Sequence, residues 1–495
     1  MTREVGRRRL RPVRGRFVAV AGVVIVAVAV AVIDSTTPVP RPSAGRPVQG
    51  AVPITPVGSY SSSAFCAGGT VGPGEPANST IYLTNTSDRA VQGVMTSVVA
   101  PGTGAGTSGN SGGSGAPAVL RRVEVPASGA AAINPGTGLG AGYEATSLTF
   151  AGGGVAVNQV VSGTGGWSTA PCASQPSSSW YFAGGSTAKG NALTLALSNP
   201  AATSAVVDVS FLTSAGVIAP PGYQGLVVAP GRLVTENVGD FVQNQTGIAT
   251  IVSAQSGGVV ADQLQQWSAP PTGGLALQLG SPTLSTVWQF AQTTSSPGAA
   301  VTFYLANPGR AAATASIGIG LSMGSVVPVR VSVPGQSVAM FVASSAARLP
   351  SQIPYSVTVH ASAAIVVGRS VEAARGATPP VWGSSIGVAS AATHWWVPAP
   401  GVINAPGIAG ATVTSMAVAN TGPTPAHVVV TTPGTSRPVA SFIVKPGSLG
   451  VLGSPLVDGL HAYDVRSTQA VTVEEDDRPA GAAGIVSSTG LPFAG

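Results

Sequence analysis

Side chains that could carry out chemistry are scarce in this sequence. Its 495 residues include only 17 acidic residues, 4 histidines and 2 cysteines. A glycosidase-type mechanism needs two closely placed carboxyl groups, but the stretch 177–390 contains only five acidic residues. The sequence also lacks a G-x-S-x-G motif, a phosphate-binding P-loop and an H-E-x-x-H motif. We therefore expect a protein that is not an enzyme, with no catalytic residues and no cofactor.

Metal binding would need histidines or carboxylates at suitable spacings. The histidines show no metal-ligand spacing, so we expect surface or capping roles for them; they are His360, His394, His427 and His461. The run EEDDRP at 474–479 has carboxylates of the kind that bind calcium. Consecutive strand residues point to opposite faces, however, so we interpret this run as a solvated strand end. No metal site is expected.

The two cysteines, Cys66 and Cys172, are expected to form a disulfide bond. Both follow an apolar N-terminal segment that we expect to place the rest of the chain outside the cytoplasm. An even number of cysteines in that compartment implies a disulfide. The alternative is a free redox pair, but such pairs have C-x-x-C spacing, which is absent here.

One short aromatic phrase occurs four times and indicates repeated domains. It reads SAFCAGGT at 63–70, SSSWYFAGGST at 177–187, TVWQFAQTT at 286–294 and THWWVPAPG at 393–401. After each copy comes an asparagine preceded by apolar residues two and four positions earlier. Such alternation, ending in a turn residue, is typical of a half-buried strand. These asparagines are Asn85, Asn199, Asn307 and Asn420.

Each repeat has about seven expected short strands in roughly 100 residues, which is the scale of an immunoglobulin-like β-sandwich. Propeller blades are the alternative, but their period of about 40–50 residues is too short. We predict an all-β fold of four tandem immunoglobulin-like β-sandwich units after one N-terminal transmembrane helix. The expected segments are a basic tip (1–16), a signal anchor (17–33), a Pro-rich spacer (34–62), unit 1 (63–173, with a Gly/Ser loop at 102–117), unit 2 (177–281), unit 3 (285–390) and unit 4 (393–495).

The tryptophans fall into two sets with different predicted roles. Trp180, Trp288 and Trp396 belong to the aromatic phrase, and we expect them to fill the sandwich cores, because large aromatic side chains dominate core burial. In the fourth copy the adjacent Trp395 is the alternative core residue. The alternative is that exposed rings of this set stack on sugars. A second set lies between the units and is our candidate for glycan contact; it consists of Trp167, Trp267 and Trp382.

The N-terminus is typical of a membrane anchor. Seven arginines in the first sixteen residues precede an apolar run at 17–33. Seventeen residues make a helix of roughly 26 Å, close to the thickness of a bilayer core. The positive-inside rule then puts the N-terminus in the cytoplasm and the bulk outside. The alternative is a signal peptide that is cleaved, giving a secreted protein.

The remaining composition excludes nucleic-acid binding. Outside the first sixteen residues the chain has 16 basic and 16 acidic residues, so its net charge there is zero. Charged residues make up only 8% of the chain, while 66 glycines and 41 prolines indicate frequent turns.

The phrases WYFAGGST, LALSNP and VVADQ, with the boundary WGSSIGVASAATHWW, resemble a family of repeat-bearing actinobacterial proteins of unknown function. The resemblance implies tandem β domains in the cell envelope. The family's opening phrase has an acid where Gly184 stands here, and its closing strand has a Glu-Arg pair. This chain has Asp262-Gln263, Arg369-Ser370 and Glu474-Glu475 in the closing strands.

These observations favour a non-enzymatic, membrane-anchored scaffold or interaction protein of the bacterial cell envelope, with the four units arranged as a rod. The alternative is a glycan-binding accessory protein in envelope polysaccharide assembly. Expected partners are the membrane, through one helix, and an envelope glycan or protein.

Overall fold

The computed structural model describes residues 53–100, 118–268, 273–294, 299–343, 349, 353–373, 382–399, 412–453, 461–479 and 486–493. The basic tip, the apolar run at 17–33, most of the Pro-rich spacer and the Gly/Ser loop at 102–117 lie outside these residues. The described residues are all-β apart from two single-turn 3₁₀ helices, and all belong to one compact unit, Val48–Ala494. Among them, no helix is long and apolar enough to cross a membrane.

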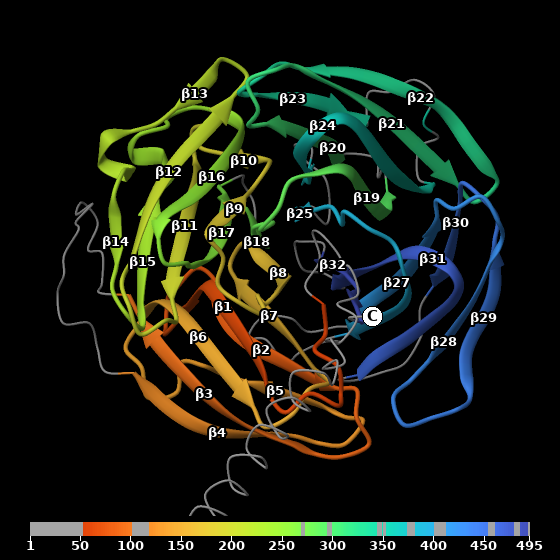
Figure 1. Ribbon diagram of the computed structural model, residues 1–495, viewed down its shortest axis with the longest axis horizontal. Coiled ribbons are helices and arrows are strands. Elements are labelled where there is room, and N and C mark those ends of the chain that lie inside the picture. Colours follow the sequence, from red (N-terminus) through yellow and green to blue (C-terminus); the bar gives the residue numbers. More distant parts are fainter. Residues whose placement is uncertain are drawn as a thin grey trace, which may run out of the picture. The chain divides into compact units, whose positions relative to one another are not determined.

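The strands fall into four groups that follow the four sequence repeats (Figure 1). Group 1 contains β1 (Ser62–Val71), β2 (Asn78–Asn85), β3 (Val91–Val99), β4 (Val119–Val125), β5 (Ala130–Ile133), β6 (Gly142–Phe150), β7 (Val155–Gly163) and β8 (Gly166–Pro171). Group 2 contains β9 (Ser179–Tyr181), β10 (Gly185–Ser186), β11 (Asn191–Asn199), β12 (Ala205–Thr213), β13 (Gly216–Ile218), β14 (Leu226–Val228), β15 (Arg232–Asn237), β16 (Thr246–Ser256), β17 (Val260–Trp267) and β18 (Gly274–Leu279), with the 3₁₀ helices η1 (Pro221–Tyr223) and η2 (Val238–Asp240).

Groups 3 and 4 each contain one very long strand. Group 3 contains β19 (Ser285–Thr294), β20 (Ala299–Asn307), β21 (Ala313–Leu321), β22 (Gly324–Val333), β23 (Ser337–Val342), β24 (Pro354–Ala373) and β25 (Gly383–Ile386). Group 4 contains β26 (Ala392–Ala399), β27 (Thr412–Asn420), β28 (Ala426–Thr431), β29 (Pro438–Val444), β30 (Ser448–Gly453), β31 (His461–Pro479), β32 (Val486–Thr489) and β33 (Leu491–Pro492). The first halves of β24 and β31 correspond to β6 and β16, and their second halves correspond to β7 and β17.

Every group has the same pair of sheets. In group 2 these are β10-β16-β12-β13, with β9 and β14 alongside, and β15-β11-β17-β18. Group 1 has β4-β3-β6-β1 and β5-β2-β7-β8, which a single parallel pairing at Thr70–Asn78 connects. Groups 3 and 4 have the same pairings, with β24 and β31 running through both sheets. Side chains of both sheets meet in one core, as in a sandwich.

The strand order differs from that of an immunoglobulin constant-type sandwich. In that fold the first strand lies in one sheet with the second, fourth and fifth strands. Here the first strand, β1, pairs with the sixth, and the seventh strand, β7, pairs with the second. The all-β prediction is therefore confirmed, while the immunoglobulin-like label is not.

The predicted alternation explains why these segments form strands. In β12, Val207, Val209 and Phe211 are fully buried, while Asp208 and Ser210 between them are half-buried on the other face. Period-two patterns of this kind put one face of a strand into the core. The strands β2, β11, β20 and β27 all end at the asparagine that the sequence marked as a strand end.

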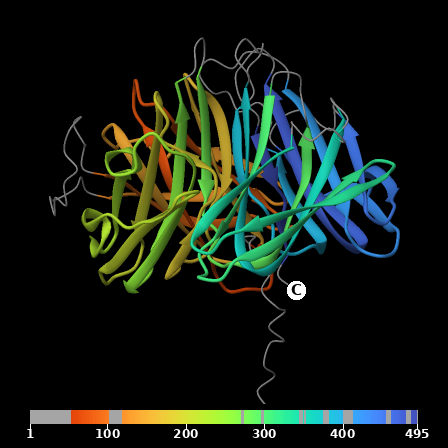
Figure 2. The same cartoon turned by 90° about the horizontal axis from the view of Figure 1, so that it is seen from above.

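The four groups contact one another in a closed cycle within the compact unit. One strand from the end of each group lies near its middle, where β8 contacts β18, β18 contacts β25, β25 contacts β32, and β32 contacts β8 (Figure 1). Figure 2, which is turned by 90°, shows most of the strands running between the upper and lower sides of the view. From the sequence we expected a rod, in which the first and last units would not touch. That expectation was wrong, because a 100-residue period says nothing about contacts between the repeats.

The ends of the described chain meet where groups 4 and 1 join. Ile54 forms a parallel bridge to Phe493, and its backbone N–H donates to the carbonyl of Pro492 at 2.9 Å. Ile54 is buried with Trp396 and Leu491. We call this contact the seam.

Candidate functional site: the buried polar interfaces between groups

The three tryptophans predicted to contact glycans are buried. Trp167 packs on Tyr82 and Val160, and only 3% of its surface is exposed. Trp267 of group 2 and Trp382 of group 3 stack on each other with their centroids 5.2 Å apart and their planes at 26°. Their exposed fractions are 4% and 6%. Among the described residues, no hydrogen-bond partner reaches the indole N–H of any of the three. The structure therefore holds these rings between elements of the protein rather than at its surface.

The tryptophans of the repeated phrase fill the cores, with one correction. Trp180 and Trp288 are buried as predicted, and each donates its indole N–H to a carbonyl of the closing strand segment, at 2.7 and 2.9 Å. In group 4 the corresponding residue is Trp395, which donates to the carbonyl of Val471 at 2.8 Å. Core packing had been expected for Trp396 instead. Adjacent strand residues face opposite sides, so only one of the two can enter the core.

Trp396 lies between groups 4 and 1. Its indole N–H donates to the Thr84 hydroxyl at 2.7 Å, and its ring packs with Ile54 and Leu491 at the seam.

Group 1 has alanine at the position of the core tryptophan. Ala64 pairs with Leu148 as Trp180 pairs with Val252. A small pocket lies there, and its lining includes Ala64, Ile54 and Cys172. Cys172 of the disulfide and the segment around Ile54 thus border the space beside this alanine.

The repeated asparagines are structural. Each side-chain NH₂ donates to the carbonyl four residues later and to the last carbonyl of a neighbouring strand. Each side-chain oxygen accepts the backbone N–H two residues later. An asparagine can satisfy a turn and a strand end at once, because its amide group has both donors and an acceptor. This set comprises Asn85, Asn199, Asn307 and Asn420.

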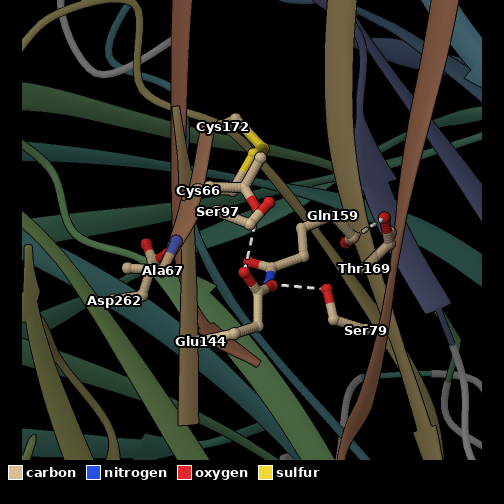
Figure 3. Close-up of a disulfide and its surroundings, with 10 residues drawn as sticks. Cys66, Ala67, Ser79, Ser97, Glu144, Gln159, Thr169, Cys172 and Asp262 are labelled. Atoms are coloured by element: carbon tan, nitrogen blue, oxygen red, sulfur yellow. Dashed lines mark hydrogen bonds between the residues drawn. A yellow bond between two sulfur atoms is a disulfide. The ribbon is translucent and has the colours of Figure 1, made fainter. Parts of the chain in front are cut away.

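The predicted disulfide is present. Cys66 on β1 is bonded to Cys172, which directly follows β8, and the Cα atoms lie 4.7 Å apart (Figure 3). The bond therefore joins the first and last strands of group 1.

Two buried carboxyl groups lie at the interface of groups 1 and 2, near the disulfide (Figure 3). Glu144 on β6 is completely buried, accepting hydrogen bonds from Gln159 at 2.9 Å and Thr146 at 2.8 Å. Asp262 on β17 is 2% exposed and accepts the backbone N–H of Ala67 of group 1 at 2.7 Å. Burial raises the pKa of Glu144 to about 7 and raises the pKa of Asp262 as well. Asp262 thus connects the two groups through a neutral donor, while Glu144 bonds within group 1 and acts on Asp262 through its charge.

The interface of groups 3 and 4 contains a buried ion pair. Arg369 on β24 forms a salt bridge with Glu474 on β31, and both side chains are at most 3% exposed. The Arg369 guanidinium also donates to the backbone carbonyl of Gln292, while the Glu474 carboxylate accepts the N–H of Gln292 at 2.9 Å. Burial alone would lower the pKa of Arg369, but the carboxylates of Glu474 and Asp476 raise it.

The acidic run at 474–479 is not a solvated strand end, as the sequence analysis had interpreted it. Glu474, Glu475 and Asp476 are all buried. The second half of β31 lies in the middle of a sheet between β27 and β32, and at the interface with group 3. In the part of the chain that the structure describes, no group of three or more histidine, cysteine or acidic side chains could hold a metal ion.

Two of the described histidines have local partners, and His360 is exposed. His394 contacts Asp464 at 2.7 Å and stacks on Phe493, and Nε2 of His427 lies 3.1 Å from the Ser441 hydroxyl. Burial would raise the pKa of Asp464, but hydrogen bonds from His394 and Arg466 lower it.

Glu236 is a further acid with a raised pKa. It pairs with Leu195, which is buried in the group 2 core, so Glu236 lies on the core side of its sheet. The other groups have apolar residues at this position, namely Ile133, Phe341 and Leu452. Burial, with a smaller effect of Asp240, raises its pKa to about 7.

Asp262, Arg369 and Glu474 were assigned to the closing strands from the sequence, but not to the interfaces between groups, and Glu144 was not singled out. Strand pairing shows that Asp262 and Glu474 are at equivalent positions of groups 2 and 4, because they pair with the equivalent residues Ala196 and Ala417. Gly368 is at the equivalent position of group 3. Arg369 is one position further along. The sequence signal for these residues is a charged side chain inside an otherwise apolar strand, which is rare in a chain with so few charged residues.

The family model described as "Family of unknown function (DUF5719)" matches residues 144–441, more than half of the chain. The chain belongs to this family.

Two solved structures show weak similarity. The "Crystal Structure of Thermotoga maritima 1070" is 16% identical, with 21% of this chain and 92% of that chain covered and a TM-score of 0.20. A "tetra-tandem repeat in extending region of large adhesion protein" is 13% identical, with 83% and 94% covered and a TM-score of 0.10. Scores this low carry no argument about fold or function. None of the curated proteins matches the chain.

Proposed function

We propose that this protein is a non-enzymatic, membrane-anchored scaffold or interaction protein outside the cytoplasm, in a bacterial cell envelope. The N-terminal arginines and the apolar run at 17–33 support the anchor. The Cys66–Cys172 bond supports an oxidising compartment, because disulfides persist there and are rare in the cytosol. The resemblance to actinobacterial repeat proteins supports the envelope as the location.

One observation carries the scaffold role: buried ionisable side chains join strand groups to one another. Arg369 and Glu474 connect groups 3 and 4, and Asp262 connects group 2 to the backbone of group 1. A buried charge is costly unless it is paired and hydrogen-bonded. The Arg369–Glu474 pair meets this requirement at an interface between groups. Such a contact holds the groups in fixed positions, as a scaffold that presents surfaces to a partner would need.

The glycan-binding alternative has less support. Its candidate residues Trp167, Trp267 and Trp382 are at most 6% exposed. Sugar stacking needs an accessible ring face, so these rings would have to move before they could bind a glycan. We therefore expect no change in tryptophan fluorescence when envelope polysaccharide is added.

Photo-crosslinking in the native membrane tests the scaffold role. A photoreactive amino acid replaces one exposed side chain at a time, at Leu120 (66% exposed), Met323 (91%) or Ile443 (66%), on groups 1, 3 and 4. The proposal predicts a reproducible adduct with an envelope protein at one or more positions, absent without irradiation. The absence of adducts at all three positions, with normal protein levels, would argue against it.

A further inference from the structure

The interface of groups 1 and 2 has two buried carboxyl groups, and their described partners are neutral. Glu144 accepts bonds from an amide and a hydroxyl, and Asp262 Oδ2 accepts one backbone N–H. Asp262 Oδ1 has no hydrogen-bond partner in the described part of the chain, although the residue is only 2% exposed. No salt bridge to either side chain occurs among the described residues.

The interface of groups 3 and 4 provides an internal comparison. Glu474 occupies the register of Asp262 and likewise accepts a backbone N–H from the first strand of the preceding group. Glu474, however, also bonds to Arg369. One equivalent acid is thus neutralised by a cation, while the other has a second acid, Glu144, nearby.

We propose that the interface of groups 1 and 2 is a proton-dependent latch, closed while Glu144 and Asp262 are protonated and loosened when they ionise. An ionised carboxylate in the closed interface has only neutral donors, whereas in the opened interface water solvates it. Other ionisable side chains near this interface include Tyr143, whose hydroxyl lies 3.0 Å from that of Thr194, and Glu75, which acts on Tyr143. Arg232 and Glu236 lie on β15, which contacts β3 and β6 of group 1. Among the described residues none of these side chains forms a salt bridge with Glu144 or Asp262.

The direction of the pH effect follows from the pKa shifts. Burial raises the pKa of Glu144 from 4.5 to about 7, and both burial and Glu144 raise the pKa of Asp262. Because the closed state binds these protons more tightly than the opened state, closure is most favourable below about pH 4.5. It weakens as the pH rises through about 7. Each of the two carboxyls contributes up to a tenfold change in the opening equilibrium per pH unit, over the range between its pKa in the opened state and its pKa in the closed state.

Hydrogen exchange of the intact protein tests the latch. Protection factors, corrected for the intrinsic exchange rate at each pH, are compared for peptides covering β1 and β19. We expect protection of β1, which includes the Ala67 amide, to fall about 10- to 100-fold from pH 5 to pH 7.5. Protection of β19, which includes the Gln292 amide, should change much less. Equal pH dependence of the two peptides would overturn the proposal without any variant.

Isosteric variants then assign the effect to the two side chains. Glu144→Gln with Asp262→Asn should abolish the extra pH dependence of β1, because neither replacement titrates and both preserve the described hydrogen-bond acceptors. Glu236→Gln is the matched control, since Glu236 titrates over a similar range but lies on the core side of its sheet. Persistence of the pH dependence in the double variant, or its loss in the control, would refute the latch.

Discussion

Replacing Trp288 with alanine should destabilise group 3 strongly. Trp288 is fully buried, and its indole N–H donates to the carbonyls of Ile365 and Ser285. A buried tryptophan removes roughly 200 Å² from water, or about 5 kcal/mol at 25 cal/mol per Å². Measured Trp→Ala costs of about 3–5 kcal/mol agree with that figure. The lost hydrogen bond adds about 1 kcal/mol.

Two control variants separate these contributions. Trp288→Phe keeps most of the ring but removes the donor, so we expect a cost of about 1–2 kcal/mol. Met323→Ala, in the same group and 91% exposed, should change stability by less than about 0.5 kcal/mol.

Scanning calorimetry is the assay for all three variants. The group 3 core includes Ala183, Leu212 and Ala249 of group 2. The transition containing group 3 should therefore shift to lower temperature together with part of group 2, rather than separate as an independent unit. A wild-type profile for Trp288→Ala would refute the core assignment and favour a binding role for this ring.

Three further predictions concern the contacts that hold the groups together. Replacing Cys66 and Cys172 with alanine should cost about 4–5 kcal/mol on the chain-entropy model, since the bond spans 106 residues, and hydrogen exchange should show the largest loss of protection in group 1; equal loss in all groups would contradict this. Arg369→Met should cost about 3–5 kcal/mol in denaturant unfolding because it leaves Glu474 buried without its cation, and adding Glu474→Gln should recover part of that loss; no recovery would count against the ion pair as the cause. Ile54→Asp should open the seam and expose β33 to limited proteolysis, while Val57→Asp, at a position 49% exposed, should not; equal cleavage of both variants would exclude the seam as the reason.

Local patterns in the sequence predicted the strands, the core tryptophans and the disulfide. Alternation before Asn199 and Asn307 reflects a strand with one face in the core, and a period of two identifies it without knowledge of the partner strand. Trp180 and Trp288 follow for the same reason. Trp395 and Trp396 are adjacent, so the pattern alone could not decide which of them faces inward.

Contacts between the groups could not be predicted in this way. The Arg369–Glu474 pair spans 105 residues, and the Ala67–Asp262 hydrogen bond spans 195. Neither has a local signal beyond an isolated charge in an apolar strand. The tryptophans between the repeats were candidates for glycan contact, whereas in the structure Trp267 and Trp382 stack on each other across two groups. No local pattern predicts that contact.

Labelling of intact cells tests most directly the central claim that the β groups lie outside the cytoplasm on a membrane anchor. Met323→Cys places a thiol at a position that is 91% exposed and far in sequence from the disulfide. With the full-length variant in its native host, a membrane-impermeant maleimide should label this cysteine in intact cells, and the labelled chain should sediment with the membranes. Labelling only after lysis, or a labelled chain found only in the medium, would contradict the account.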